Sequence, residues 1–170
     1  MSELSFIVLA RAIHVLSGVA WAGATFVMAG VVGPIAARYG AEGAGRWLGM
    51  VARRAGKASL IAALLTVASG GYLFSALHPH DTSASGLVLI SGSVAALLSL
   101  AVGLLVGRPA GLRLARLQEA RPEGGPPAAD LLQRMATLRL RATVSARVTA
   151  GLLGAAVLAM AVFRYAAAVA

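Results

Sequence analysis

The sequence predicts an all-α integral membrane protein, namely a four-helix bundle with a cytoplasmic helical hairpin extension between its third and fourth spans. Of its 170 residues, 59% are hydrophobic and 12% are charged, and the mean hydropathy is +0.82. These values lie outside the usual range for a soluble globular domain. Because one span needs about 20 apolar residues, the chain has room for about four helices. We therefore interpret residues 1–170 as a single four-span domain.

The apolar stretches predict spans at about 5–37, 57–78, 86–107 and 143–168. The first runs without a break to Pro34 and lacks a small-residue cleavage site, so we interpret it as a retained span rather than a signal peptide. Proline and glycine close the spans, since proline cannot continue a helix. These markers are Pro34 with Tyr39-Gly40, the turn His78-Pro79-His80-Asp81, and Gly107-Arg108-Pro109.

The segment between the third and fourth spans predicts two further helical stretches. GLRLARLQEA continues the third span, AADLLQRMATLRLRA leads into the fourth, and PEGGPP between them predicts a turn. Together they form the helical hairpin outside the membrane.

Basic residues are concentrated in two of the three loops, and the loop between spans two and three has none. The two basic loops hold Arg38, Arg46, Arg53, Arg54, Lys57, Arg108, Arg113, Arg116, Arg121, Arg134, Arg139 and Arg141. By the positive-inside rule these loops face the cytoplasm. This predicts a multi-pass protein of the bacterial inner membrane with periplasmic N- and C-termini. The charges indicate contact with anionic lipids on the cytoplasmic side rather than with nucleic acid.

Several classes of chemistry are excluded by residue type. The chain has no cysteine, so it has no disulfide, thiolate metal site or CxxCH haem attachment. It shows no HExxH motif and no Ser/His/Asp arrangement of a hydrolase. No acidic residue lies within a predicted span, which disfavours carboxylate-based proton transport. Whether the chain is an enzyme stays open.

The three histidines, His14, His78 and His80, all fall toward the outer face in this topology. Ionisable groups inside a bilayer are expensive, so this cluster predicts a functional site. Helical spacing places one stripe of span one toward the bundle interior. The stripe consists of Arg11, His14, Gly18, Trp21, Thr25 and Met28.

Small residues in the other spans predict close helix contacts or room for a ligand. They are Ser59, Thr66, Gly70, Gly92, Ser99, Gly103, Gly151 and Gly154.

His14 has two interpretations. It is a neutral imidazole bonded to a Ser or Thr of a neighbouring helix, or it is an axial ligand of haem b held between facing helices. In the second case Arg11 and Arg164 pair with the haem propionates. Trp21 then packs against the haem ring, the alternative being ordinary packing within the bundle.

The turn HPHD offers a second kind of site. His78, His80 and Asp81, together with His14 if it is near, supply nitrogen and oxygen ligands suited to copper(II) or zinc. The alternative is that these are solvated loop residues.

The spacing of His14, Trp21 and Gly23 resembles that of the four-helix membrane proteins grouped around the copper-resistance protein D domain and the bacterial four-helix protoporphyrinogen oxidase. The likeness extends over the chain through KASLIAALLTVASGGYL, which follows a basic loop, and GLLGAAVLAMAVFRY. The resemblance implies a compact bundle, in some members binding haem b through the first-span histidine, here His14. The oxidase type carries a lysine and a histidine in span three. Residues 86–107 have neither, which disfavours oxidase activity and leaves a bis-histidine haem dependent on His78, His80 or a partner subunit.

We therefore expect a small inner-membrane protein that binds haem b, or alternatively copper or zinc, near its outer face, with a redox, carrier or sensing role. The alternative is a non-catalytic copper-handling or transport accessory, or a structural subunit. A second copy of the chain or a partner membrane subunit is the expected protein partner.

Overall fold

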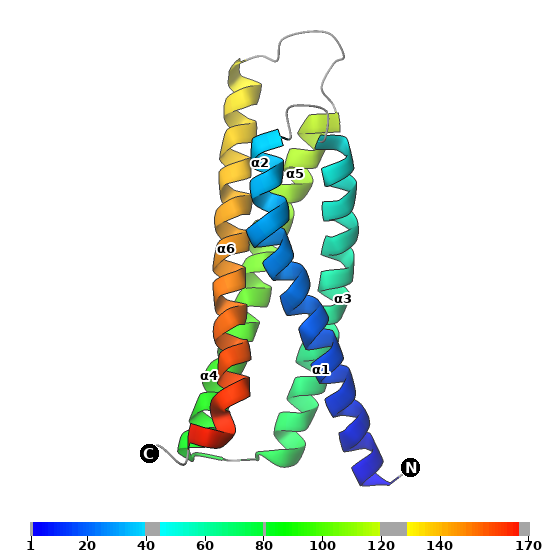
Figure 1. Cartoon of the computed structure of the whole chain (residues 1–170), viewed down its shortest axis with the longest axis vertical. Helices are drawn as coiled ribbons and strands as arrows, with labels where there is room; N and C mark the ends of the chain where they lie inside the picture. The colour runs from blue at the N-terminus through cyan, green and yellow to red at the C-terminus, as the bar shows by residue number, and fades with distance from the viewer. Residues whose placement is uncertain (1, 40–44, 80, 120–128, 167–170) are drawn as a thin grey trace.

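The computed structural model describes residues 2–39, 45–79, 81–119 and 129–166. All regular elements in these ranges are helices, which confirms the predicted all-α class (Figure 1). Two of them, η1 and η3, are π-helical segments. The elements are α1 (Glu3–Val27), η1 (Met28–Val32), α2 (Gly33–Tyr39), α3 (Gly45–Leu77), α4 (Ala84–Val102), η3 (Gly103–Gly107), α5 (Arg108–Glu119) and α6 (Ala129–Ala166).

Consecutive elements join end to end into four long helices. In the described chain, four helical stretches are long and apolar enough to cross a membrane, which agrees with the four predicted spans. They are Glu3–Ala36, Gly49–Leu77, Ala84–Glu119 and Ala129–Ala166. Large aliphatic side chains are exposed along all of them, for example Leu16, Leu64, Leu98 and Leu158. Such an extended apolar surface is what lipid tails cover.

The helices run through the two prolines that were predicted to close spans one and three. Pro34 and Pro109 both lie inside continuous helix, directly after η1 and η3. At each segment the following N–H reaches five residues back, from Gly33 to the Met28 carbonyl and from Arg108 to the Gly103 carbonyl. A proline ring normally clashes with the carbonyl four residues earlier, and a wider π turn relieves that clash.

Helix also extends further into the basic segments than the predicted span limits. α3 begins at Gly45 rather than near residue 57. The two helical stretches predicted on either side of the third loop are confirmed within the described residues, since α5 continues the third long helix and α6 runs from Ala129 into span four. Helices therefore flank the predicted tip PEGGPP on both sides. The tip itself lies outside the described residues.

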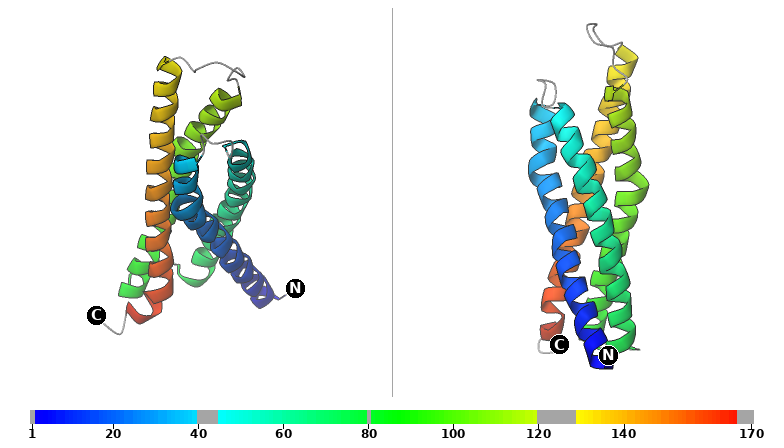
Figure 2. Two further views of the ribbon diagram at one scale, coloured as in Figure 1. Left: turned by 45° about the horizontal axis from the view of Figure 1, so that its top comes forward. Right: turned by 90° about the vertical axis from the view of Figure 1, so that its right-hand side faces the viewer.

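The four long helices form two pairs, α1 with α3 and α4 with α6. Figure 2 shows α1 and α3 side by side from a second direction. The start of α1, the end of α6 and the α3–α4 turn lie at one end of the bundle, and α5 and the start of α6 lie at the other (Figure 1). The basic segments therefore gather at one end. At this end an ion pair joins Arg53 of α3 to Glu119 of α5.

Small side chains let α4 and α6 approach closely. A Cβ added at Gly92 would lie 2.8 Å from the Ala159 Cβ, and one at Gly107 would lie 2.7 Å from the Ser145 Oγ. Ser99 donates a hydrogen bond to the Thr149 carbonyl at 3.2 Å. The predicted packing role thus holds for Gly92 and Ser99. Gly103 and Gly151 instead face open space, with nothing within 4 Å of an added Cβ.

The two pairs meet around Trp21, which is only 4% exposed. Its indole packs in a cluster with one or two residues from each of the other three helices, namely Ala63, Ala96, Leu153 and Ala156. Since its neighbours are mostly alanines, this single large side chain fills the space at the centre of the bundle.

We expect Gly92→Val to destabilise the α4/α6 contact by about 1–3 kcal/mol, because the added side chain must displace Ala159. Thermal or denaturant unfolding of the purified protein in detergent measures the effect. Gly151→Val is the matched control, since that position faces open space. Equal losses for the two variants would contradict the role assigned to Gly92.

Candidate functional site

His14 of α1 is held against α3 by a hydrogen bond to the main chain. Its Nδ1 lies 2.9 Å from the carbonyl oxygen of Thr66, and the Ser69 Oγ is 3.5 Å from the same nitrogen. The side chain is half-buried. His14 is therefore bonded across helices as one interpretation of the sequence requires, although its partner is a backbone carbonyl rather than a hydroxyl.

A glycine on α3 makes room for the imidazole. A Cβ added at Gly70 would lie 2.7 Å from the Cε1 of His14 and 3.0 Å from its Nδ1. No other residue type fits there without moving the ring. Gly70 and the Thr66 carbonyl together fix the position of His14 on α3.

The hydrogen bond sets the tautomer of the neutral ring. A carbonyl oxygen can only accept, so Nδ1 carries the proton and Nε2 keeps its lone pair. Among the described residues no group bonds to Nε2. Nε2 is also not buried, because the Thr149 Oγ1 is the one buried side-chain N or O atom in the described residues that lacks a partner. Nε2 is thus an accessible, unbonded acceptor.

Ser17 and Thr66 form a second polar contact one turn along the same interface. The Thr66 Oγ1 donates to the Ser17 Oγ at 2.8 Å, and the Ser17 Oγ donates to the Ile13 carbonyl at 2.6 Å. Both side chains are buried. The contact anchors α1 on α3 directly beside His14.

The other residues proposed to surround a cofactor are more dispersed. Arg11 is exposed on α1 one turn from His14. Trp21 lies ~10 Å further along α1, in the central core, where it has the packing role given above as the alternative. Arg164 is exposed on α6, its guanidinium carbon 6.0 Å from the centre of the Phe163 ring. In the described part of the chain neither arginine forms an ion pair.

His78 and Asp81 interact with each other at the α3–α4 turn. The His78 Nδ1 lies 3.5 Å from the Asp81 Oδ2, and the His78 ring meets Phe163 of α6 edge-on at 6.1 Å. Hydrogen bonds from the side chain and backbone of Ser83, with a smaller contribution from His78, lower the pKa of Asp81. Ser83 in turn caps α4 by accepting from the Gly86 N–H. These contacts bind α3, α4 and α6 together at this end.

No metal site is assembled in the part of the chain that the structure describes. Those residues contain no group of three or more His, Asp or Glu side chains able to hold one ion. His78 and Asp81 form a pair, His14 is bonded to α3, and His80 lies outside the described ranges. The metal set predicted from the sequence stays a hypothesis.

The sequence analysis did not single out Ser17 or Ser69, although both contribute to the surroundings of His14. Their spacing could have identified them, since each lies one helical turn from a residue already selected, Ser17 from His14 and Ser69 from Thr66.

Comparison of the chain with protein-family models, curated proteins and solved structures finds no match. The resemblance to the copper-resistance protein D and four-helix oxidase group therefore stays a prediction carried by its motif.

We expect Ser17→Ala and Thr66→Val to be less than additive in their effect on stability, with a coupling free energy of about 0.6 kcal/mol, because each removes the same interhelical hydrogen bond. A double-mutant cycle on unfolding in detergent measures the coupling. Full additivity would show that the contact adds nothing to the α1/α3 association.

Proposed function

We propose that this chain is a bacterial inner-membrane four-helix protein that binds haem b through the Nε2 of His14. The supporting observation is the hydrogen bond from His14 Nδ1 to the Thr66 carbonyl. Metal-ligating histidines generally donate their second ring nitrogen to a carbonyl or carboxylate, which fixes the ring and strengthens the ligating nitrogen. His14 already has this arrangement, and its Nε2 is free.

The remaining residues fit this assignment to different degrees. Arg11 lies one turn from His14, and its flexible side chain suits pairing with a propionate. Trp21 is buried in the central cluster, and the role that this proposal gives it is to fix α1 within the bundle. Arg164 is at the same end of the molecule, on α6.

His14 is the histidine to which the proposal gives the proximal position. The Nδ1 of His78 contacts Asp81, which also leaves its Nε2 available, and His80 lies outside the described residues. The sixth position of the iron is therefore left to His78, His80, a small ligand or a partner subunit. Bound haem b supplies electron exchange or a site for a small diatomic ligand. The proposal therefore covers a redox, carrier or sensing role, and His14 serves as the proximal ligand.

The orientation follows from the charge distribution. The basic segments gather at one end of the bundle, and the opposite end contains the start of α1 and the α3–α4 turn, which has no Lys or Arg. His14 lies in the first half of α1 and is therefore nearer this second end. The positive-inside rule places the basic end in the cytoplasm. His14 then lies toward the periplasmic side, where both termini emerge.

Topology reporters test this orientation. A reporter that is active only in the periplasm is expected to be inactive when fused at about residues 45 or 125 and active at the C-terminus, because the basic segments stay in the cytoplasm. The reverse pattern would place His14 toward the cytoplasm.

His14→Ala is expected to lose haem and its Soret band while keeping helix content and monodispersity, because packing of small residues rather than this imidazole holds the bundle together. The protein is produced with ample haem, purified in detergent and analysed by visible spectroscopy and haem extraction. His78→Ala is the comparison variant; we expect it to keep haem, with a shifted Soret band if His78 supplies the second axial ligand.

A second variant tests the geometry of the site. Gly70→Ala keeps His14 but places a methyl group against its ring, so we expect reduced haem content or a shifted Soret maximum. Full haem retention in His14→Ala would remove His14 as the ligand. A colourless wild-type protein would leave the alternative function, a non-catalytic copper-handling or transport accessory or a structural membrane subunit. The Thr66 bond is compatible with that alternative, since a histidine with a packing role also makes it.

A further inference from the structure

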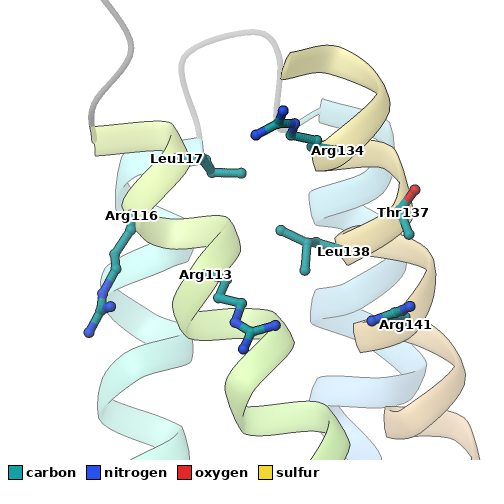
Figure 3. A pocket seen from close by; sticks show the side chains of 7 residues that line it. All are labelled: Arg113, Arg116, Leu117, Arg134, Thr137, Leu138 and Arg141. Atoms are coloured by element: carbon teal, nitrogen blue, oxygen red, sulfur yellow. The ribbon is translucent and has the colours of Figure 1, made fainter. Parts of the chain in front are cut away.

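The end of the molecule opposite His14 contains a groove between α5 and α6 that is rich in arginine. It is open, has a volume of about 550 Å³, and is lined by Arg113, Arg116, Leu117, Arg134, Thr137, Leu138 and Arg141. Figure 3 shows Arg113 of α5 and Arg141 of α6 on facing sides, with Leu138 between them and Arg134 nearer the helix ends. Arg116 points away from the groove in this view.

The groove carries a strong positive charge. Of the four arginines that line the groove, only Arg134 has an acidic partner among the described residues, Asp130 at 3.7 Å, and both members of that pair are largely exposed. Arg113 and Arg141 point toward one another across the groove (Figure 3), and the described residues that line it include no carboxylate. Guanidinium groups in this arrangement suit an anion with several oxygens, above all a phosphate, which they bind in a bidentate way.

A second, apolar groove continues directly from the first. It has a volume of about 390 Å³ and shares Arg113, Leu138 and Arg141 with the charged groove. Its other lining residues come from η3 and the first turn of α5, namely Leu105, Val106, Pro109 and Ala110. The two grooves form one continuous surface groove with a cationic end and an apolar end, and we call it the α5/α6 channel.

This combination distinguishes a lipid from a free anion. Inorganic phosphate would contact the arginines alone and leave Leu105, Val106 and Pro109 without a role. A phospholipid has a phosphate diester and an acyl chain in the order that the channel presents them. Basic pockets between membrane helices at the cytoplasmic surface are known to take anionic headgroups.

We infer that the α5/α6 channel is a specific site for an anionic phospholipid. The phosphate lies between Arg113 and Arg141, Arg134 neutralises further headgroup charge, and one acyl chain follows the apolar groove along η3. The site is independent of His14 and of haem binding.

Native mass spectrometry of the full-length protein tests the site. The protein is released from nanodiscs of equal phosphatidylglycerol and phosphatidylcholine content, and the retained lipids are counted. We expect wild-type protein to retain phosphatidylglycerol in preference, and Arg113→Gln/Arg141→Gln to lower its retention about tenfold. Arg108→Gln/Arg139→Gln is the matched control, since it removes the same charge from the same two helices outside the channel.

The apolar groove and the source of the phosphate are tested separately. Val106→Trp fills the groove and should weaken phosphatidylglycerol retention while all arginines remain, and inorganic phosphate should not displace the lipid. Circular dichroism and gel filtration verify that each variant is folded.

Three outcomes would overturn the inference. Equal losses in the two arginine pairs would indicate attraction by general surface charge. Displacement by millimolar inorganic phosphate would indicate a free-anion site. Equal retention of both lipids would show that the channel does not select an anionic headgroup.

Discussion

Close contact between helix backbones is the constraint on which this structure depends. In lipid, association of apolar helices gains nothing from leaving water, so it relies on packing and on a few interhelical hydrogen bonds. The chain provides Gly70 and Thr66 in the α1/α3 interface, and Gly92, Ser99 and Ser145 in the α4/α6 interface. Trp21 then needs only alanines and one leucine to complete the centre. The place of His14 follows, because the small residues on α3 bring its imidazole within reach of a carbonyl.

Hydropathy was sufficient to predict the fold class and the number of spans, because apolar length is a direct requirement of the bilayer. The prediction that Pro34 and Pro109 close spans one and three was wrong, because helix continues through both. Whether a proline ends a helix depends on the hydrogen-bond register of the turn before it, and a π turn there has no distinct residue pattern. The start of α3 was also missed, since the amphipathic residues before 57 look like a loop when only apolar runs are sought.

The candidate site was predictable in part. Helical spacing correctly placed His14 and Trp21 on the inward stripe of α1. Helical spacing could not identify the hydrogen-bond acceptor of His14, because that acceptor is the backbone carbonyl of Thr66 and every residue type has such a carbonyl. The sequence selected Thr66 only as a small residue. The HPHD turn predicted a ligand set because its residues are adjacent in sequence. The contact of His78 with Asp81, which closes the end of the bundle, could not be predicted from the sequence, and the ligand set stays a hypothesis. The arginine channel escaped notice because its residues come from two helices separated by the PEGGPP tip.

The pairing of the helices also bears on how the protein is made. Each tight interface joins two long helices that follow one another in the chain. α1 with its extension α2 precedes α3, and α4 with its extension α5 precedes α6, so contact order within each pair is low. The α1/α3 pair has its own contacts, among them the Ser17–Thr66 hydrogen bond, which do not require the second pair. The contacts between the two pairs need both to be present, among them those of Trp21 with Ala96, Leu153 and Ala156, the Arg53–Glu119 ion pair and the His78–Phe163 contact. Folding thus divides into the formation of two local helix pairs and the docking of these pairs around the Trp21 indole.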